Sequence, residues 1–172
     1  MTPAGEKPDS SRPRWLAVLL ATVIMLFSYG MILFAFVAES ESVFAGGVLG
    51  IGLGLVPVVF AACGFVSRSE HALKRGLIAT GIWAVIVIPI GIVDLPTGLV
   101  AGFGGGGIVA LDGGQHRSAR ARVLAVAAAA IYTFALQQAS PEAGLFGGAP
   151  LPFLAIAVAD VWAERRAGED QA

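Results

Sequence analysis

Two runs of 24 residues without a single charge, 15–38 and 43–66, constrain this chain more than any other feature. A helix that crosses a membrane needs roughly 20 consecutive apolar residues. Across all 172 residues, 56% are apolar, 13% are charged and the mean hydropathy is +0.80, whereas soluble domains carry about 25% charged residues. The sequence therefore excludes a water-soluble monomer and predicts an all-α integral membrane bundle.

The apolar block 76–111 is too long for one crossing. It is interrupted only by Asp94-Leu95-Pro96-Thr97, and proline, aspartate and threonine in this order are typical of a turn that starts a new helix. We therefore expect two short membrane helices, 76–93 and 95–111, each about 26 Å long. The alternative is a re-entrant hairpin that enters from the inside, with Asp94 at its tip.

Two more apolar runs, 123–138 and 143–162, follow a basic segment and are separated by the turn sequence Ala139-Ser140-Pro141-Glu142. Pro150 and Pro152 interrupt the first half of the last run. The sequence thus predicts six membrane helices in three hairpins over residues 15–162. We expect the polar tails, 1–14 and 163–172, to be cytoplasmic.

The positions of the basic residues predict the orientation of this bundle, because Lys and Arg collect in short cytoplasmic loops. Six spans with both termini inside place every basic residue in the cytoplasm and leave only acids in the three outer turns. The residues that set this topology are Arg12, Arg14, Arg68, Lys74, Arg75, Arg117, Arg120, Arg122, Arg165 and Arg166. The same clusters would attract anionic lipids. We expect a multi-pass protein of the plasma membrane.

Two runs of glycines recur at four-residue spacing, so each run lines one face of its own helix in a glycine-zipper pattern. They are Gly46, Gly50 and Gly54, and Gly98, Gly102 and Gly106. Close approach of backbones through such faces is a main source of helix association in lipid. We expect these faces to serve tight packing within the bundle, either against each other or against other helices, with a partner subunit or a second copy as the alternative.

A few polar residues lie within the predicted spans. Ser28 and Tyr29 in the first helix and Tyr132 and Thr133 in the fifth could line a small polar path if the two helices face each other. Asp160, near the inner end of the sixth helix, is a further candidate for contact with a proton or cation. The alternative is an interfacial carboxylate paired with Arg165 or Arg166.

Asp94, by contrast, is expected to cap the helix that follows it. The string that starts at Gly102 and ends at Gly107 satisfies GxGxxG but lies inside an apolar helix rather than after a strand, so it does not predict a dinucleotide site. No catalytic triad, metal-binding motif or pair of carboxylates is apparent, and we expect no cofactor and no enzymatic activity. A net charge of −1 gives no indication of nucleic-acid binding.

A compact six-helix protein with both ends inside is broadly similar to the substrate-binding subunits of energy-coupling-factor transporters. Those subunits contact a partner through small residues of their first helix, and Ala17 and Ala21 have this spacing here. The resemblance implies transport of a small solute. The residues themselves favour a non-enzymatic accessory or scaffold subunit, with a small transport protein for a neutral or weakly polar solute as the alternative.

Overall fold

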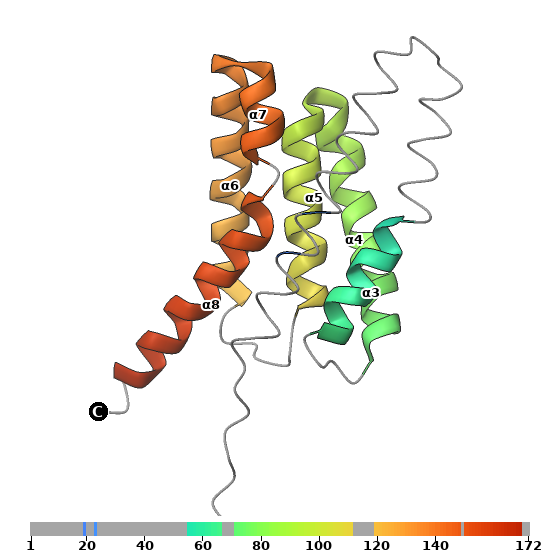
Figure 1. Cartoon of the computed structure of the whole chain (residues 1–172), viewed down its shortest axis with the longest axis vertical. Coiled ribbons are helices and arrows are strands. Elements are labelled where there is room, and N and C mark those ends of the chain that lie inside the picture. Colours follow the sequence, from blue (N-terminus) through green and yellow to red (C-terminus); the bar gives the residue numbers. More distant parts are fainter. Residues whose placement is uncertain are drawn as a thin grey trace, which may run out of the picture.

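A computed structural model describes residues 55–66, 71–111, 119–148 and 150–169, together with Leu19 and Val23. Regular structure in these ranges is entirely helical, which confirms the predicted all-α class there (Figure 1). The helices are α3 (Val56–Val66), α4 (Ala72–Val93), α5 (Leu95–Ala110), α6 (Ala119–Ala139), α7 (Pro141–Gly148) and α8 (Leu151–Glu169). Leu19 and Val23 are helical and exposed.

Asp94 alone separates α4 from α5, as the turn sequence predicts. Its backbone is extended, and its Oδ2 accepts a hydrogen bond from the backbone N–H of Thr97 at 3.0 Å. Pro96 occupies the first turn of α5, where its missing N–H leaves no bond unmade. The predicted role of Asp94 as a helix cap is therefore confirmed.

Loss of this cap gives a first testable expectation. Asp94→Ala should lower the free energy of unfolding by about 1 kcal/mol, because one N–H of the first turn of α5 loses its acceptor. Asp94→Asn should cost much less, since its side-chain oxygen can still accept the bond. Chemical denaturation in detergent, followed by circular dichroism, measures both variants. Equal losses for the two would contradict the capping role.

The last apolar run forms two helices rather than one. α7 ends at Gly148 and α8 begins at Leu151, and the two axes differ by 46°. Pro150 lies at the break, and a proline removes a donor and clashes with the preceding turn of a helix. Proline at the break therefore explains why this continuous apolar run does not form one continuous helix.

α5 occupies the centre of the described bundle, between α4 on one side and α6 on the other (Figure 1). Its residue Phe103 is the middle of an aromatic cluster, with ring centroids 6.0 Å from Phe60 of α3, 5.9 Å from Trp83 of α4 and 6.4 Å from Phe153 of α8. Phe60, Phe103 and Phe153 are fully buried. The core therefore sits where α3, α4 and α8 all meet α5.

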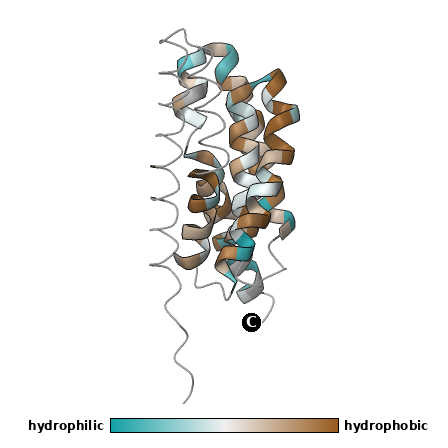
Figure 2. Ribbon diagram, turned by 90° about the vertical axis from the view of Figure 1, so that its right-hand side faces the viewer, coloured by the Kyte–Doolittle hydropathy of each residue, from teal (hydrophilic) through white to brown (hydrophobic). Residues whose placement is uncertain are grey.

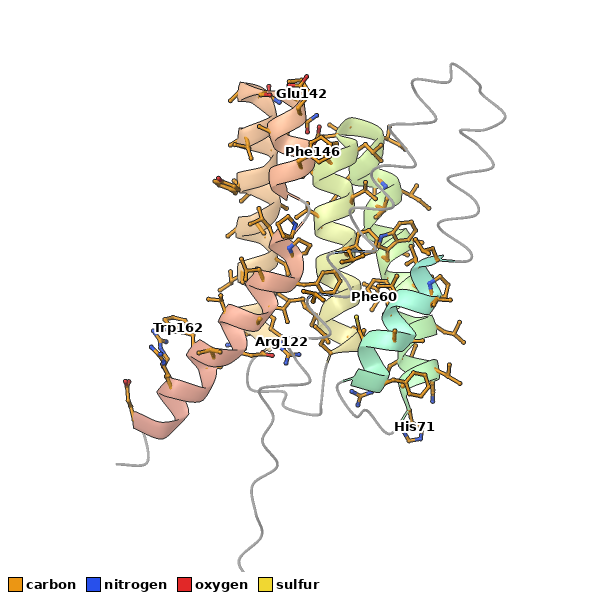
Figure 3. All side chains as sticks on the ribbon, viewed as in Figure 1. Phe60, His71, Arg122, Glu142, Phe146 and Trp162 are labelled. Carbon is orange, nitrogen blue, oxygen red and sulfur yellow. The ribbon has the colours of Figure 1, made fainter. Side chains whose placement is uncertain are left out.

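The bundle has two chemically different ends. The α4–α5 turn and the α6–α7 turn lie together at the top of Figure 1, and Glu142 marks this acidic end in Figure 3. The start of α4, the start of α6 and the end of α8 lie at the opposite, basic end, where His71, Arg122 and Trp162 are labelled. The two acidic turns thus lie at one end of the bundle, and the exposed bases of the described helices lie at the other.

Two helices, α4 and α6, are long and apolar enough to cross a membrane, and α7 with α8 would make a third if the bent pair is one span. The outward face of α4 carries exposed Leu77, Val85, Ile88 and Ile92. Figure 2 shows hydrophobic residues along most of the described helices. A membrane bundle is therefore possible on length and composition.

Candidate functional site

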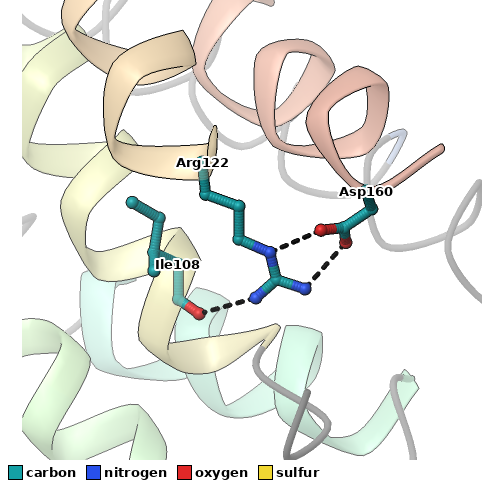
Figure 4. A network of polar contacts seen from close by, with 3 residues as sticks. All are labelled: Ile108, Arg122 and Asp160. Carbon is teal, nitrogen blue, oxygen red and sulfur yellow. Dashed lines mark hydrogen bonds and ion pairs between the residues drawn. The ribbon is translucent and has the colours of Figure 1, made fainter. Parts of the chain in front are cut away.

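A buried ion pair between α6 and α8 is the most chemically distinctive feature of the described residues (Figure 4). The Nε of Arg122 donates to Oδ1 of Asp160 at 2.5 Å, and its Nη2 donates to Oδ2 at 2.8 Å. Arg122 is 3% exposed and Asp160 is 7% exposed. Two parallel charge-assisted hydrogen bonds of this kind form the strongest arrangement available to an arginine and a carboxylate.

The same arginine also contacts the third helix of the site. Its Nη1 lies 3.4 Å from the backbone oxygen of Ile108, in the last turn of α5. The final carbonyls of a helix have no partner within it, and they carry the negative end of the helix dipole. Arg122 therefore joins α5, α6 and α8 at the basic end through one guanidinium group.

The pattern of α6 explains why Arg122 points inward. Arg122, Val126, Ala129 and Thr133 are buried and recur at spacings of four, three and four residues, which line one face of a helix. The apolar run predicts a helix that starts at Val123 and places Arg122 in a loop, whereas α6 begins at Ala119. Extending the buried stripe by one turn would have placed an arginine on it.

The predicted pairing of Asp160 with Arg165 or Arg166 is wrong. Asp160 pairs with Arg122 of α6, not with Arg165 or Arg166 of its own helix. Five residues along an α-helix turn through about 500°, so Arg165 lies about 140° away from Asp160 around α8. Arg166 instead places its guanidinium 3.8 Å from the ring centroid of Trp162, a favourable cation–π distance.

Atoms of neighbouring helices occupy the space where the glycines of α5 would carry a side chain. A methyl group on Gly98 would lie 2.6 Å from the backbone nitrogen of Gly91 in α4. One on Gly102 would overlap Val87 of α4, and one on Gly106 would overlap the ring of Phe60 in α3. Gly46, Gly50 and Gly54 lie outside the described residues, so contact between the two glycine runs stays a prediction.

Two more glycines extend this close packing to other helices. A methyl group on Gly104 would overlap Val126 of α6, and one on Gly107 would lie 3.0 Å from both Phe153 and Ile156 of α8. The four-residue spacing indicates one glycine face, but α5 has glycines in close contact on several sides. A helix that packs against neighbours on several sides can use glycine outside a single four-residue spacing.

The predicted polar path is not assembled by the residues that the structure describes. Thr133 is buried, and its hydroxyl donates to the backbone oxygen of Ala129 at 2.9 Å. Tyr132 is exposed on the other side of α6. Ser28 and Tyr29 lie outside the described residues. A threonine that bonds its own helix has no donor left for a solute.

A few polar atoms in the described part of the bundle are nevertheless buried without a hydrogen-bond partner. They are Nη1 of Arg75, Nε1 of Trp83, Oγ1 of Thr97 and Oε1 of Gln137. A buried polar group of this kind costs free energy unless a partner satisfies it. A polar molecule that hydrogen-bonds to these atoms would remove this cost.

The other residues predicted to set the topology are placed only in part. Lys74, Arg120, Arg165 and Arg166 are exposed, and all belong to helix ends at the basic end. Arg12, Arg14, Arg68 and Arg117 lie outside the described residues. Within the described ranges, no group of three or more His, Cys, Asp or Glu residues could hold a metal ion.

Comparisons of the chain with protein-family models, with curated proteins and with solved structures found no match.

Proposed function

We propose that this chain is a multi-pass membrane protein whose basic end faces the cytoplasm and which acts as a non-enzymatic accessory or scaffold subunit. In this topology, α4 and α5 are two separate crossings, α3 is part of the second span, and α7 with α8 is the sixth. Both acidic turns lie at one end and the exposed bases at the other, which agrees with the preference of Lys and Arg for the cytoplasmic side.

The filled core of the bundle is the observation that carries the scaffold role. All six glycines of α5, at positions 98, 102, 104, 105, 106 and 107, have neighbouring atoms where a side chain would be. The aromatic rings of Phe60, Phe103 and Phe153 occupy the centre. A rigid, closely packed bundle suits a protein that holds partners in a membrane. One surface left for lipid or for another subunit is the exposed apolar face of α4.

Extraction at native abundance in a mild detergent, followed by mass spectrometry of whatever stays bound, tests this role. We expect a membrane protein to be recovered in fixed proportion, or a second copy of the chain. Val85→Trp on the exposed face of α4 should reduce that recovery, while Phe134→Trp on the exposed face of α6 serves as the matched control. Recovery of a monomer alone would contradict the scaffold role.

Transport of a small, weakly polar solute is the second candidate, and the partnerless buried atoms favour it. Nε1 of Trp83 is a donor and Oγ1 of Thr97 is both donor and acceptor. A solute that bonds these atoms would be retained through purification and detected in the same mass-spectrometry experiment. Trp83→Phe keeps the ring contact with Phe103 but removes the N–H, so it should abolish retention without unfolding the chain. Retention that survives this substitution would contradict the assignment.

A further inference from the structure

The C-terminal half of α8 is attached to the bundle very differently from the N-terminal half. Pro152, Phe153 and Ile156 of the first half are buried in the core. From Val158 to Glu169, only Ala159 and Asp160 are buried among the side chains that the structure describes. Because Ala159 contributes only a methyl group, which offers little apolar area, the carboxylate of Asp160 is the main attachment of this half among its described side chains.

Beyond Asp160, α8 leaves the bundle. Figure 1 shows its end directed away from α5 and α6, and Figure 3 shows Trp162 on the outward side. Val161, Trp162, Arg165 and Arg166 are all exposed. The stacking of Arg166 on Trp162 is a contact within α8 itself, so it does not fix this segment to the rest of the protein.

We propose that the Arg122–Asp160 pair is a latch that sets the position of the C-terminal half of α8. Arg122 is the fixed member, since it belongs to α6 and contacts the backbone of Ile108 in α5. Asp160 is the moving member. When the pair opens, the C-terminal half of α8 separates from α5 and α6 at the basic end and pivots about the packed residues Phe153 and Ile156.

The chemistry of the pair suits a latch. A buried ion pair gains attraction but loses the hydration of both ions, so its net stabilisation is small even when its geometry is good. The closed position of α8 is therefore expected to be favoured over the open one by no more than about 3 kcal/mol. α5 has no ionisable residue, and the one carboxylate of α6 and α7, that of Glu142, lies at the acidic end.

This proposal goes beyond the scaffold role and does not depend on it. The test is a distance measurement by double electron–electron resonance on the full chain in detergent, with Cys63 replaced by Ala. Nitroxides are attached at Leu124→Cys on the exposed face of α6 and at Gly168→Cys, where nothing lies within 4 Å of an added side chain. Asp160→Asn should shift the distances to longer values and broaden them.

Arg122→Lys keeps the positive charge but loses the two-pronged geometry, and it should give an intermediate shift if Asp160→Asn does not fold. A second label pair at the acidic end, Val93→Cys with Glu142→Cys, is the matched control and should not change. Unaltered distances in Arg122→Lys and Asp160→Asn would overturn the latch. Equal broadening of the control pair would also overturn it, because the whole bundle would then have loosened.

Discussion

Replacing Asp160 with asparagine should lower the free energy of unfolding of the bundle by about 3 kcal/mol. Removing one member of a buried ion pair costs about 3–5 kcal/mol, because the other charge stays buried without compensation. We expect the lower end of this range, since release of the C-terminal half of α8 lets water reach Arg122. Reversible denaturation in mixed micelles, monitored by circular dichroism, measures the change.

Two further variants distinguish the effect of the ion pair on stability from that of the surrounding residues. Arg122→Met together with Asp160→Leu removes both charges, and it should cost less than Asp160→Asn alone because neither buried ion is left unpaired. Arg120→Gln removes an exposed charge from the same turn of α6 and should change stability by less than about 0.5 kcal/mol. A double variant as unstable as the single one would mean that packing at residue 160, not charge, carries the effect.

Gly98→Ala should be the most damaging of the single-methyl changes in α5, at about 2–3 kcal/mol of unfolding free energy. The added carbon would lie 2.6 Å from the nitrogen and 2.7 Å from the Cα of Gly91. Backbone atoms cannot rotate away as the tip of a side chain can, so α4 and α5 must separate. Thermal and chemical denaturation in detergent both report this loss.

The matched control is Gly81→Ala on the outward face of α4. Nothing lies within 4 Å of a methyl group at this position, and alanine favours a helix over glycine by up to about 1 kcal/mol. Gly81→Ala should therefore be neutral or stabilising. If Gly98→Ala and Gly81→Ala were equally stable, the close approach of α4 and α5 at Gly91 would be contradicted.

Local sequence signals located the break between α4 and α5 but not every helix end, because α4 and α6 begin earlier than predicted and α8 continues to Glu169, into the predicted tail 163–172. Asp94 and Pro96 predicted the break between α4 and α5 to within a residue, because capping and proline chemistry act over a single turn. Hydropathy placed the start of α6 four residues late, since its basic first turn reads as a loop. Pro150 predicted an interruption, but not that the run would form two helices bent by 46°.

Contacts between helices were harder to predict from one sequence. Asp160 and Arg122 are 38 residues apart, and nothing in either local segment specifies the other as its partner. Gly104 and Gly107 were missed because a search for one glycine face assumes one neighbour, whereas α5 has neighbours on several sides. In each case the missing information was which helices lie next to each other, and this depends on the whole bundle.

Cysteine labelling from one side of the membrane tests the central claim most directly, that α4 and α5 are two crossings with the basic end inside. Val93, which is 84% exposed, and Glu142 mark the acidic end, while His71 and Gly168 mark the basic end. Each is replaced in turn by Cys and treated with an impermeant maleimide on intact cells. The native Cys63 is buried, so labelling of the unaltered chain measures the background reaction.

We expect Val93→Cys and Glu142→Cys to react in intact cells, and His71→Cys and Gly168→Cys to react only after the membrane is permeabilised. Protection of Val93→Cys while Glu142→Cys reacts would show a re-entrant hairpin in place of two crossings. Equal reaction of all four positions in intact cells would contradict the membrane topology altogether.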